Sequence, residues 1–208
     1  MLSELLIVAR PGREPHVEGC GGLTARRTEP DTVHLVSSAA TPLGGDTIRY
    51  RVVVESGARL RVRSAAATMA MPGVVTQESR ATWELDVDGE LDLDPQPLIV
   101  AGGSRHVSVT RVAVSDSSRL RLRERIQIGR AFERHGFWSG TLHADAGSTP
   151  LLRHRIEVGT GTVADDALGN PLACISELRY PETEFDTPGT LLALAAGGAL
   201  ATWQGSRL

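Results

Sequence analysis

The feature that most constrains this chain is an alternation of apolar and polar residues with a period of two. Between Thr47 and Val54, apolar side chains occupy every second position and mostly polar ones lie between them. Because successive side chains of a β-strand point to opposite faces, this period predicts strands with one face on a core. The inward apolar positions continue at Trp83, Leu85, Val87, Val107, Val109, Leu120, Leu122, Ile126 and Ile128. Helical patterning is weak, and we expect at most one helical turn over 65–70.

An internal repeat adds a second constraint. Residues 51–63 and 111–123 share seven of thirteen residues at an offset of 60, and each copy has the order strand, polar turn, strand. We interpret each copy as a β-hairpin, with further hairpin turns at Asp88-Gly89 and Gly197-Gly198. These hairpins predict a single all-β domain over residues 1–208. We expect a mainly antiparallel, layered or coiled sheet body with few short helices.

Composition excludes several classes of enzyme. All 22 basic residues are arginine, so the chain has no lysine for P-loop, pyridoxal or protein kinase chemistry. The net charge of −3 argues against a general polyanion binder. Aromatic residues make up only 4% of the chain, so the core must be built from Val, Leu, Ile and Ala.

Cysteine content and hydropathy indicate a soluble protein of the cytoplasm. Cys20 and Cys174 are the only cysteines, too few for a disulfide framework or a zinc ribbon. The longest apolar run, residues 191–201, is about half the length that a membrane span requires. The first residues lack the basic segment of a signal peptide.

Motifs for catalysis or for tight metal binding are weak. The six histidines are scattered without the spacing of a zinc site, and no G-x-S-x-G motif accompanies the serines, so a hydrolase ranks last. Residues 159–164 match G-x-G-x-x-A, but Asp165 and Asp166 follow and would repel a phosphate, so we interpret this segment as a loop.

Arginine stripes support a second candidate function. Arg59, Arg61 and Arg63 share one side of a predicted strand, and Arg119, Arg121, Arg123 and Arg125 share one side of another. The stripes lie close in sequence to acidic strands, which favours a solvated face with cross-strand ion pairs. The alternatives are a docking surface for an acidic partner and an anion- or nucleic-acid-binding β domain, although aromatic stacking residues are missing from the stripes.

An ordered series of motifs carries the interpretation further. It consists of residues 34–39, 43–46, 57–62, 65–68, 97–99, 102–105, 122–124 and 129–130, ending with Glu133. In this order and spacing, over roughly residues 24–158, the chain resembles the urease accessory protein family UreD, also called UreH. No single tetrapeptide of the series is diagnostic on its own.

The resemblance implies a mostly β fold and a function without catalysis. Proteins of this family work with a UreF-like helical protein and a UreG-like GTPase. Together they bind apo-urease and help deliver nickel to its active site, and a polar internal passage is proposed for the metal. We therefore expect no tightly bound cofactor, transient contact with nickel, and no nucleic-acid or membrane partner. The polar residues expected to line a passage or an interface are Asp46, Ser64, Thr68, Glu124, Arg130 and Glu133.

The chain departs from the family pattern in three respects, the first at residues 37–41, where the family often has Asn-Ser-Ala-Gly-Gly. Met69 stands where the family commonly has lysine, which puts any role of that charge in doubt. The chain also has less sequence than usual before residue 34, and its C-terminal part is shorter than usual for the family. Contacts that the family makes through those segments are therefore not carried over.

Overall fold

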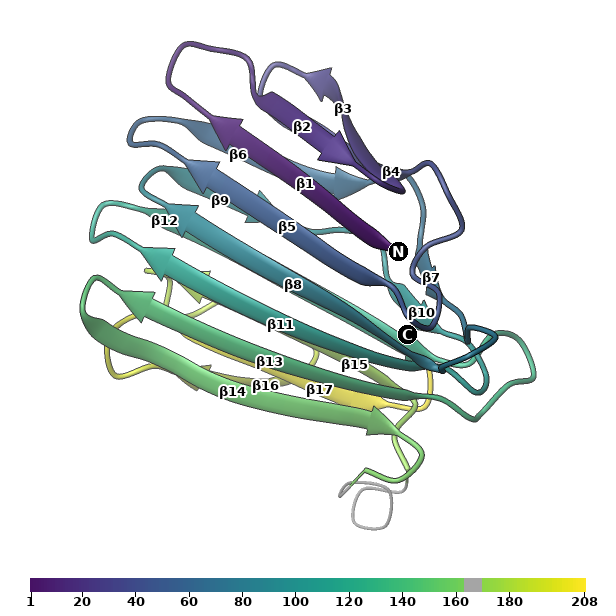
Figure 1. The fold of residues 1–208 in the computed structure, drawn as a ribbon. Coiled ribbons are helices and arrows are strands. Elements are labelled where there is room, and N and C mark those ends of the chain that lie inside the picture. Colours follow the sequence, from purple (N-terminus) through teal and green to yellow (C-terminus); the bar gives the residue numbers. More distant parts are fainter. Residues whose placement is uncertain (163–169) are drawn as a thin grey trace.

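The computed structural model describes residues 1–162 and 170–208 as two β-sheets packed face to face (Figure 1). One sheet has seven strands in the order β14-β13-β11-β8-β5-β1-β2, and the other has ten, with β16-β17-β15-β12-β9-β6-β4-β3 as its main path. The strands are β1 (Leu2–Ala9), β2 (His16–Cys20), β3 (Leu23–Glu29), β4 (Thr32–Ser37), β5 (Thr47–Val54), β6 (Arg59–Ser64), β7 (Thr68–Ala70), β8 (Glu78–Val87), β9 (Glu90–Leu93), β10 (Leu98–Val100), β11 (Arg105–Val114), β12 (Arg119–Ile128), β13 (Phe137–Ala146), β14 (Thr149–Gly159), β15 (Ala173–Tyr180), β16 (Thr190–Ala193) and β17 (Ala199–Gly205).

The chain coils between the two sheets, so the repeated unit is not the predicted hairpin. β5 and β11 lie in the seven-stranded sheet, whereas β6 and β12, which follow them, lie in the ten-stranded sheet. Each 13-residue copy therefore crosses from one sheet to the other. Neighbouring coils pair in parallel, as β5 does with β8 and β6 with β9. The sheets are mixed, and the prediction of a mainly antiparallel body was wrong.

Gly89 shows why a crossing turn resembles a hairpin turn in the sequence. The predicted type I′ hairpin at Asp88-Gly89 was wrong, because β8 and β9 belong to different sheets. A Cβ atom on Gly89 would lie 2.3 Å from the carbonyl oxygen of Ala58 and 2.6 Å from that of Glu55. Glycine is therefore required by the close approach of the turn in the preceding coil.

Two other local predictions had different outcomes. The Gly197-Gly198 turn does join an antiparallel pair, β16 and β17, so that hairpin is confirmed. The helical turn expected over 65–70 is absent, and residues 68–70 form β7, which pairs in parallel with β10. Residues 1–162 and 170–208 contain no helix, so no helix there could span a membrane. Of the loop predicted at residues 159–164, the part after residue 162 lies outside the described residues.

The charges explain why the sequence repeats after two coils rather than one. The acidic strand β9 lies between the arginine strands β6 and β12, with Asp92 in register with both Arg61 and Arg121. Directly opposed like charges would repel one another, so neighbouring coils carry opposite charges and alternate coils resemble one another. The offset of 60 residues therefore covers two coils, because the coil formed by β8 and β9 lies between the two similar copies.

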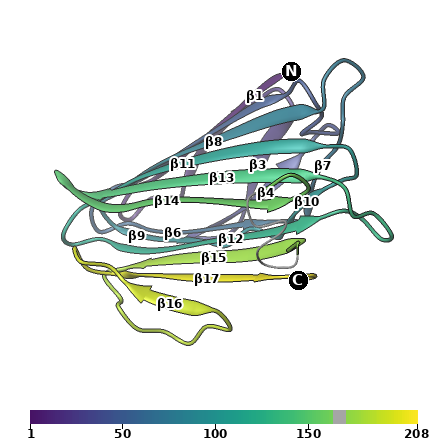
Figure 2. The ribbon, with the colours of Figure 1, turned by 90° about the horizontal axis from the view of Figure 1, so that it is seen from below.

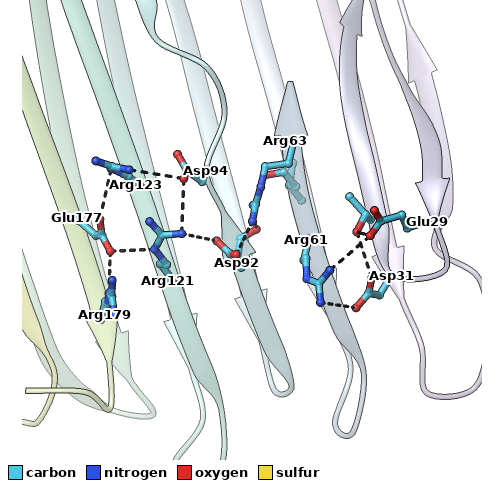
Figure 3. A network of polar contacts seen from close by, with 12 residues as sticks. Glu29, Asp31, Arg61, Arg63, Asp92, Asp94, Arg121, Arg123, Glu177 and Arg179 are labelled. Atoms are coloured by element: carbon cyan, nitrogen blue, oxygen red, sulfur yellow. Dashed lines mark hydrogen bonds and ion pairs between the residues drawn. The ribbon is translucent and has the colours of Figure 1, made fainter. Parts of the chain in front are cut away.

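The arginine stripes face outward and take part in an ion-pair network across the ten-stranded sheet (Figure 3). Glu177 accepts hydrogen bonds from Nε of Arg121 at 2.9 Å and from Nε of Arg179 at 2.7 Å, and lies 3.4 Å from Nε of Arg123. Arg121 also lies 3.5 Å from both Asp92 and Asp94. This neutralisation matches the solvated face with cross-strand ion pairs, and it lowers the positive charge available to an anionic ligand.

We expect the centre of this network to matter for stability far more than its rim. Glu177 is only 7% exposed and serves three guanidinium groups, so Glu177→Gln should lower the free energy of unfolding by about 2 kcal/mol. Glu90→Gln is the matched control, because Glu90 pairs with the exposed Arg59. The control should cost less than about 1 kcal/mol. Urea unfolding of the three proteins measures the difference, and equal losses would contradict this account.

The core between the sheets is apolar in two separate clusters. The larger cluster includes Leu60, Leu85 and Leu122, and the smaller one includes Ile126, Trp138 and Val158. Aliphatic residues dominate both clusters, as the low aromatic content predicts. On the inner face of β12, Glu124 lies between Leu122 of the larger cluster and Ile126 of the smaller one, so the gap between the clusters lies at the level of Glu124.

Candidate polar cavity between the sheets

A layer of polar side chains fills the gap between the two apolar clusters. On the inner face of β11, His106, Ser108 and Thr110 are each at most 7% exposed. Glu124 faces them from β12, and Ser176 comes from the neighbouring β15. The two sheets face each other (Figure 2), and the burial of His106, Ser108 and Thr110 places these side chains between them.

Two cavities lie at this level and meet at Glu124. The larger has a volume of about 270 Å³ and the smaller about 50 Å³. Glu124 lines both, together with Trp83 and Pro95. The larger cavity is also lined by residues 64–68 and by Gln96, which lie in the segments that lead into β7 and β10. The smaller one lies against Thr110, Ser176 and Leu178.

Glu124 is the carboxylate of this interior. Its only hydrogen-bond partner among the described residues is Ser108, whose Oγ lies 3.4 Å from Oε1. Burial raises the pKa of Glu124 to about 7, although the Ser108 hydrogen bond acts in the opposite direction. The side chain keeps some accessible surface because it faces the cavities. Its neighbours Arg125 and Arg123 line the larger and the smaller cavity, and both are ion-paired with Asp94 rather than with Glu124.

Several of the polar groups near this carboxylate are neutral. Nδ1 of His106 lies 2.9 Å from Oγ of Ser79, and burial lowers the pKa of His106 to about 4, so the imidazole is neutral at pH 7. Oγ of Ser176 is buried and has no hydrogen-bond partner among the described residues. The rings of Tyr50 and Trp83 stack with their centroids 3.7 Å apart and form an apolar wall. The cavities therefore offer one carboxylate, a few hydroxyl groups, the His106 imidazole, an aromatic surface and the guanidinium groups of Arg123 and Arg125.

Three of the six predicted residues line the larger cavity: Ser64, Thr68 and Glu124. Oγ of Ser64 donates to the carbonyl oxygen of Ala66 at 2.8 Å and accepts from the N–H of Gln96 at 2.9 Å, so it also fixes two segments of the wall. The other three predicted residues lie outside both cavities. Whether any of the six contacts nickel or a partner remains a prediction.

Asp46 holds a turn together. Its carboxylate accepts hydrogen bonds from Oγ1 of Thr41 at 3.0 Å and from the N–H of Leu43 at 2.8 Å, and lies 2.7 Å from the amino group of Met1. Burial raises the pKa of Asp46, but these partners outweigh it and the net pKa is below its usual value. Its oxygens are thus already used by the protein itself.

Arg130 and Glu133 form an ion pair in the loop between β12 and β13. Glu133 also accepts hydrogen bonds from the N–H groups of Gly102 at 2.8 Å and Arg130 at 3.0 Å. The Arg130 guanidinium and these two amides lower the pKa of Glu133 to about 2. This arrangement is characteristic of a carboxylate that shapes a loop.

The sequence interpretation missed most of the polar layer because it assigned the wrong face of β11 to the core. Val107 and Val109 were taken as inward positions, but the buried residues are His106, Ser108 and Thr110. Val112 and Val114 are buried on the inner face of the same strand. Because side chains on one face recur every second residue, these two valines place His106, Ser108 and Thr110 on that face too.

The donor set around Glu124 is too sparse for a tight metal site. Within residues 1–162 and 170–208, no group of three or more His, Cys, Asp or Glu side chains is placed to hold a metal ion. A cation beside Glu124 would therefore meet one carboxylate and hydroxyl or water oxygens. Such a set binds hard or hydrated cations weakly and exchangeably.

Comparison with known proteins points to one family. The family model described as UreD urease accessory protein matches residues 17–180. The chain is 36% identical to urease accessory protein UreD 1 of Saccharopolyspora erythraea, over 87% of this chain and 74% of that protein. It is 39% identical to the UreD protein of Frankia alni, over 76% and 61%. It is 40% identical to that of Frankia casuarinae, over 73% and 51%. The matches thus span from about half to three quarters of the length of these relatives.

Proposed function

The chain belongs to the UreD family of urease accessory proteins, and from this premise we propose that it is a urease maturation factor. In this proposal the chain is a non-catalytic scaffold that binds apo-urease together with a UreF-like accessory protein and a UreG-like GTPase. Its task is to help nickel reach the active site of urease, in the cytoplasm. Membership of the family and similarity to relatives named urease accessory protein UreD support the maturation role.

The observation that carries the mechanism is the position of Glu124 at the junction of the two cavities. A nickel ion is the cargo in this proposal, and it meets the Glu124 carboxylate, the one acidic side chain among the described residues that line these cavities. The carboxylate favours entry of the cation, and the hydroxyl groups of Ser108 and Thr110 replace part of its water shell. Because only one charged donor is present, the ion is not trapped. Weak, transient binding is what a carrier of cargo needs.

The test of this function uses cells that express urease with and without this chain. The measurement is the nickel content and specific activity of urease purified from both. We expect urease that is made in normal amounts but is poor in nickel when the chain is missing, with both properties restored when the gene is returned. Fully metallated urease in the absence of the chain would overturn the proposal.

A further inference from the structure

A row of polar side chains crosses the inner face of the ten-stranded sheet from Glu124 to the sheet edge. Glu124 of β12 is in register with Ser176 of β15, and Ser176 is in register with Thr202 of β17. Thr202 is in turn in register with Thr190 of the edge strand β16. Side chains in register on adjacent strands lie on the same face of a sheet. Because Ser176 is 6% exposed and Thr190 is exposed, the row runs from the interior towards solvent.

A second row faces the first one from the seven-stranded sheet. Trp83 of β8 is in register with Thr110 of β11, which is in register with Leu142 of β13. The edge strand β14 places His154 beside Leu142, on the same side of the molecule as β17 (Figure 1). The smaller cavity is lined by the first three residues of this row and by the first two of the other. The rows therefore face each other across the cavity, and one strand further out His154 lies opposite Thr202.

His154 has an imidazole nitrogen that the protein itself does not use. Its side chain alternates with those of the exposed Arg153 and Arg155, so it points to the inner face of β14. Nε2 of His154 is buried and has no hydrogen-bond partner among the described residues. Burial lowers the pKa of His154, so the imidazole is neutral at pH 7 and keeps a lone pair for a ligand. A buried polar atom without a partner costs free energy, and a bound ion or water molecule removes that cost.

Ser176 has the same deficit on the opposite sheet, one strand closer to Glu124. Its Oγ is buried without a partner among the described residues, and the side chain lines the smaller cavity. Two unsatisfied polar atoms thus lie along one gap between the sheets, and the hydroxyl group of Thr202 lies beside Ser176 on the next strand. The outer part of the gap therefore offers hydroxyl oxygens on one side and a neutral imidazole on the other.

We propose that Nε2 of His154 binds the cargo cation where it leaves the smaller cavity, with the hydroxyl group of Thr202 and water completing a weak site. The identity of the cargo, a nickel ion, rests on the proposed function. Glu124 attracts any divalent cation by its charge, whereas imidazole suits nickel and is a poor ligand for Mg²⁺, which prefers oxygen. His154 is therefore the residue that selects the cargo. A single nitrogen donor leaves the ion free to exchange.

The binding test follows the threonine methyl signals of the purified full chain by NMR while Ni²⁺ is added below one equivalent. Ni²⁺ is paramagnetic and broadens nearby signals, so those of Thr110 and Thr202 should broaden in the wild type. In His154→Gln, the Ni²⁺ concentration that halves the Thr202 signal should rise by about tenfold or more. An excess of Mg²⁺ should leave the broadening in place. His143→Gln is the matched control and should behave like the wild type, because His143 is in register with the exposed Arg153 on the outer face.

His154→Leu separates the role of the imidazole from that of packing. Leucine occupies similar space beside Ile156, which packs against the smaller apolar cluster, and it removes the buried nitrogen that has no partner. The thermal unfolding midpoint should therefore equal or exceed that of the wild type, while the broadening of Thr202 is lost as in His154→Gln. Broadening that survives in the leucine variant would reject His154 as a ligand. Thr110 and Thr202 signals that stay sharp in the wild type would overturn the site itself.

Urease activation in cells separates this inference from the proposed function. In medium that limits nickel, His154→Gln should lower the nickel content of urease, and His143→Gln should leave it unchanged. If His154→Gln supports full metallation while cells without the chain do not, the role of His154 is wrong and the proposed function stands. If urease is fully metallated without the chain, the proposed function fails, whereas broadening of Thr202 that depends on His154 would still support the cation site.

Discussion

Replacing Glu124 with glutamine is expected to reduce urease activation in cells to the level seen without this protein. The substitution preserves the volume of the side chain and its ability to hydrogen-bond Ser108, but it removes the carboxylate at the junction of the two cavities. A cation entering this interior would then meet no negative charge in the cavity lining, which includes Arg123 and Arg125, so its desolvation would not be compensated. Nickel content and specific activity of the purified urease provide the measurement.

Two further variants separate the charge of Glu124 from other effects of the substitution. Glu90→Gln removes a carboxylate from the exposed outer face and should leave activation unchanged. Ser176→Leu keeps Glu124 but fills the smaller cavity of about 50 Å³, and it should also reduce activation if the cargo leaves by that route. Normal activation by Glu124→Gln, at equal levels of soluble protein, would show that the carboxylate does not serve nickel transfer.

The strands were predictable from the sequence, but their partners were not. Alternation identifies residues 47–54 and 59–64 as strands because burial of one face imposes a period of two. The same alternation is compatible with pairing inside one sheet or with a crossing to the other, since both place apolar residues on a core. Gly89 does not distinguish them either, because a glycine serves a tight hairpin and a closely stacked turn equally well.

The candidate site was only partly predictable, for a related reason. Glu124 interrupts an apolar face between Leu122 and Ile126, so its inward position follows from the alternation alone. On β11 the polar residues themselves form the inner face, and the rule that apolar residues point inward selects the opposite one. The use of the Asp46 carboxylate within a turn depends on three partners, and no spacing in the sequence reveals that all three converge on it.

Glu124→Gln is also expected to stabilise the folded protein at neutral and alkaline pH while it abolishes activation. The pKa of Glu124 rises from its ordinary value of 4.5 to about 7 on folding, so the folded state holds this proton more tightly than the unfolded state. The stabilising effect of the bound proton is complete below pH 4.5 and is lost as the pH rises through 7. Ionised Glu124 then costs roughly 3 kcal/mol, a penalty that glutamine does not carry.

The measurement is the difference in unfolding free energy between Glu124→Gln and the wild type, taken from urea unfolding at a series of pH values. This difference should be close to zero below pH 4.5 and should rise to roughly 3 kcal/mol above pH 7. The comparison between variant and wild type is needed because His106 affects stability in the opposite direction. Its pKa is lowered to about 4, so the stability that the neutral imidazole contributes is lost as the pH falls from 6.5 towards 4. The two effects largely cancel in the wild type, whereas the variant keeps only that of His106. A difference that does not depend on pH would mean that another group in the cavity already neutralises Glu124. The proposal that Glu124 is available to bind a cation would then be wrong.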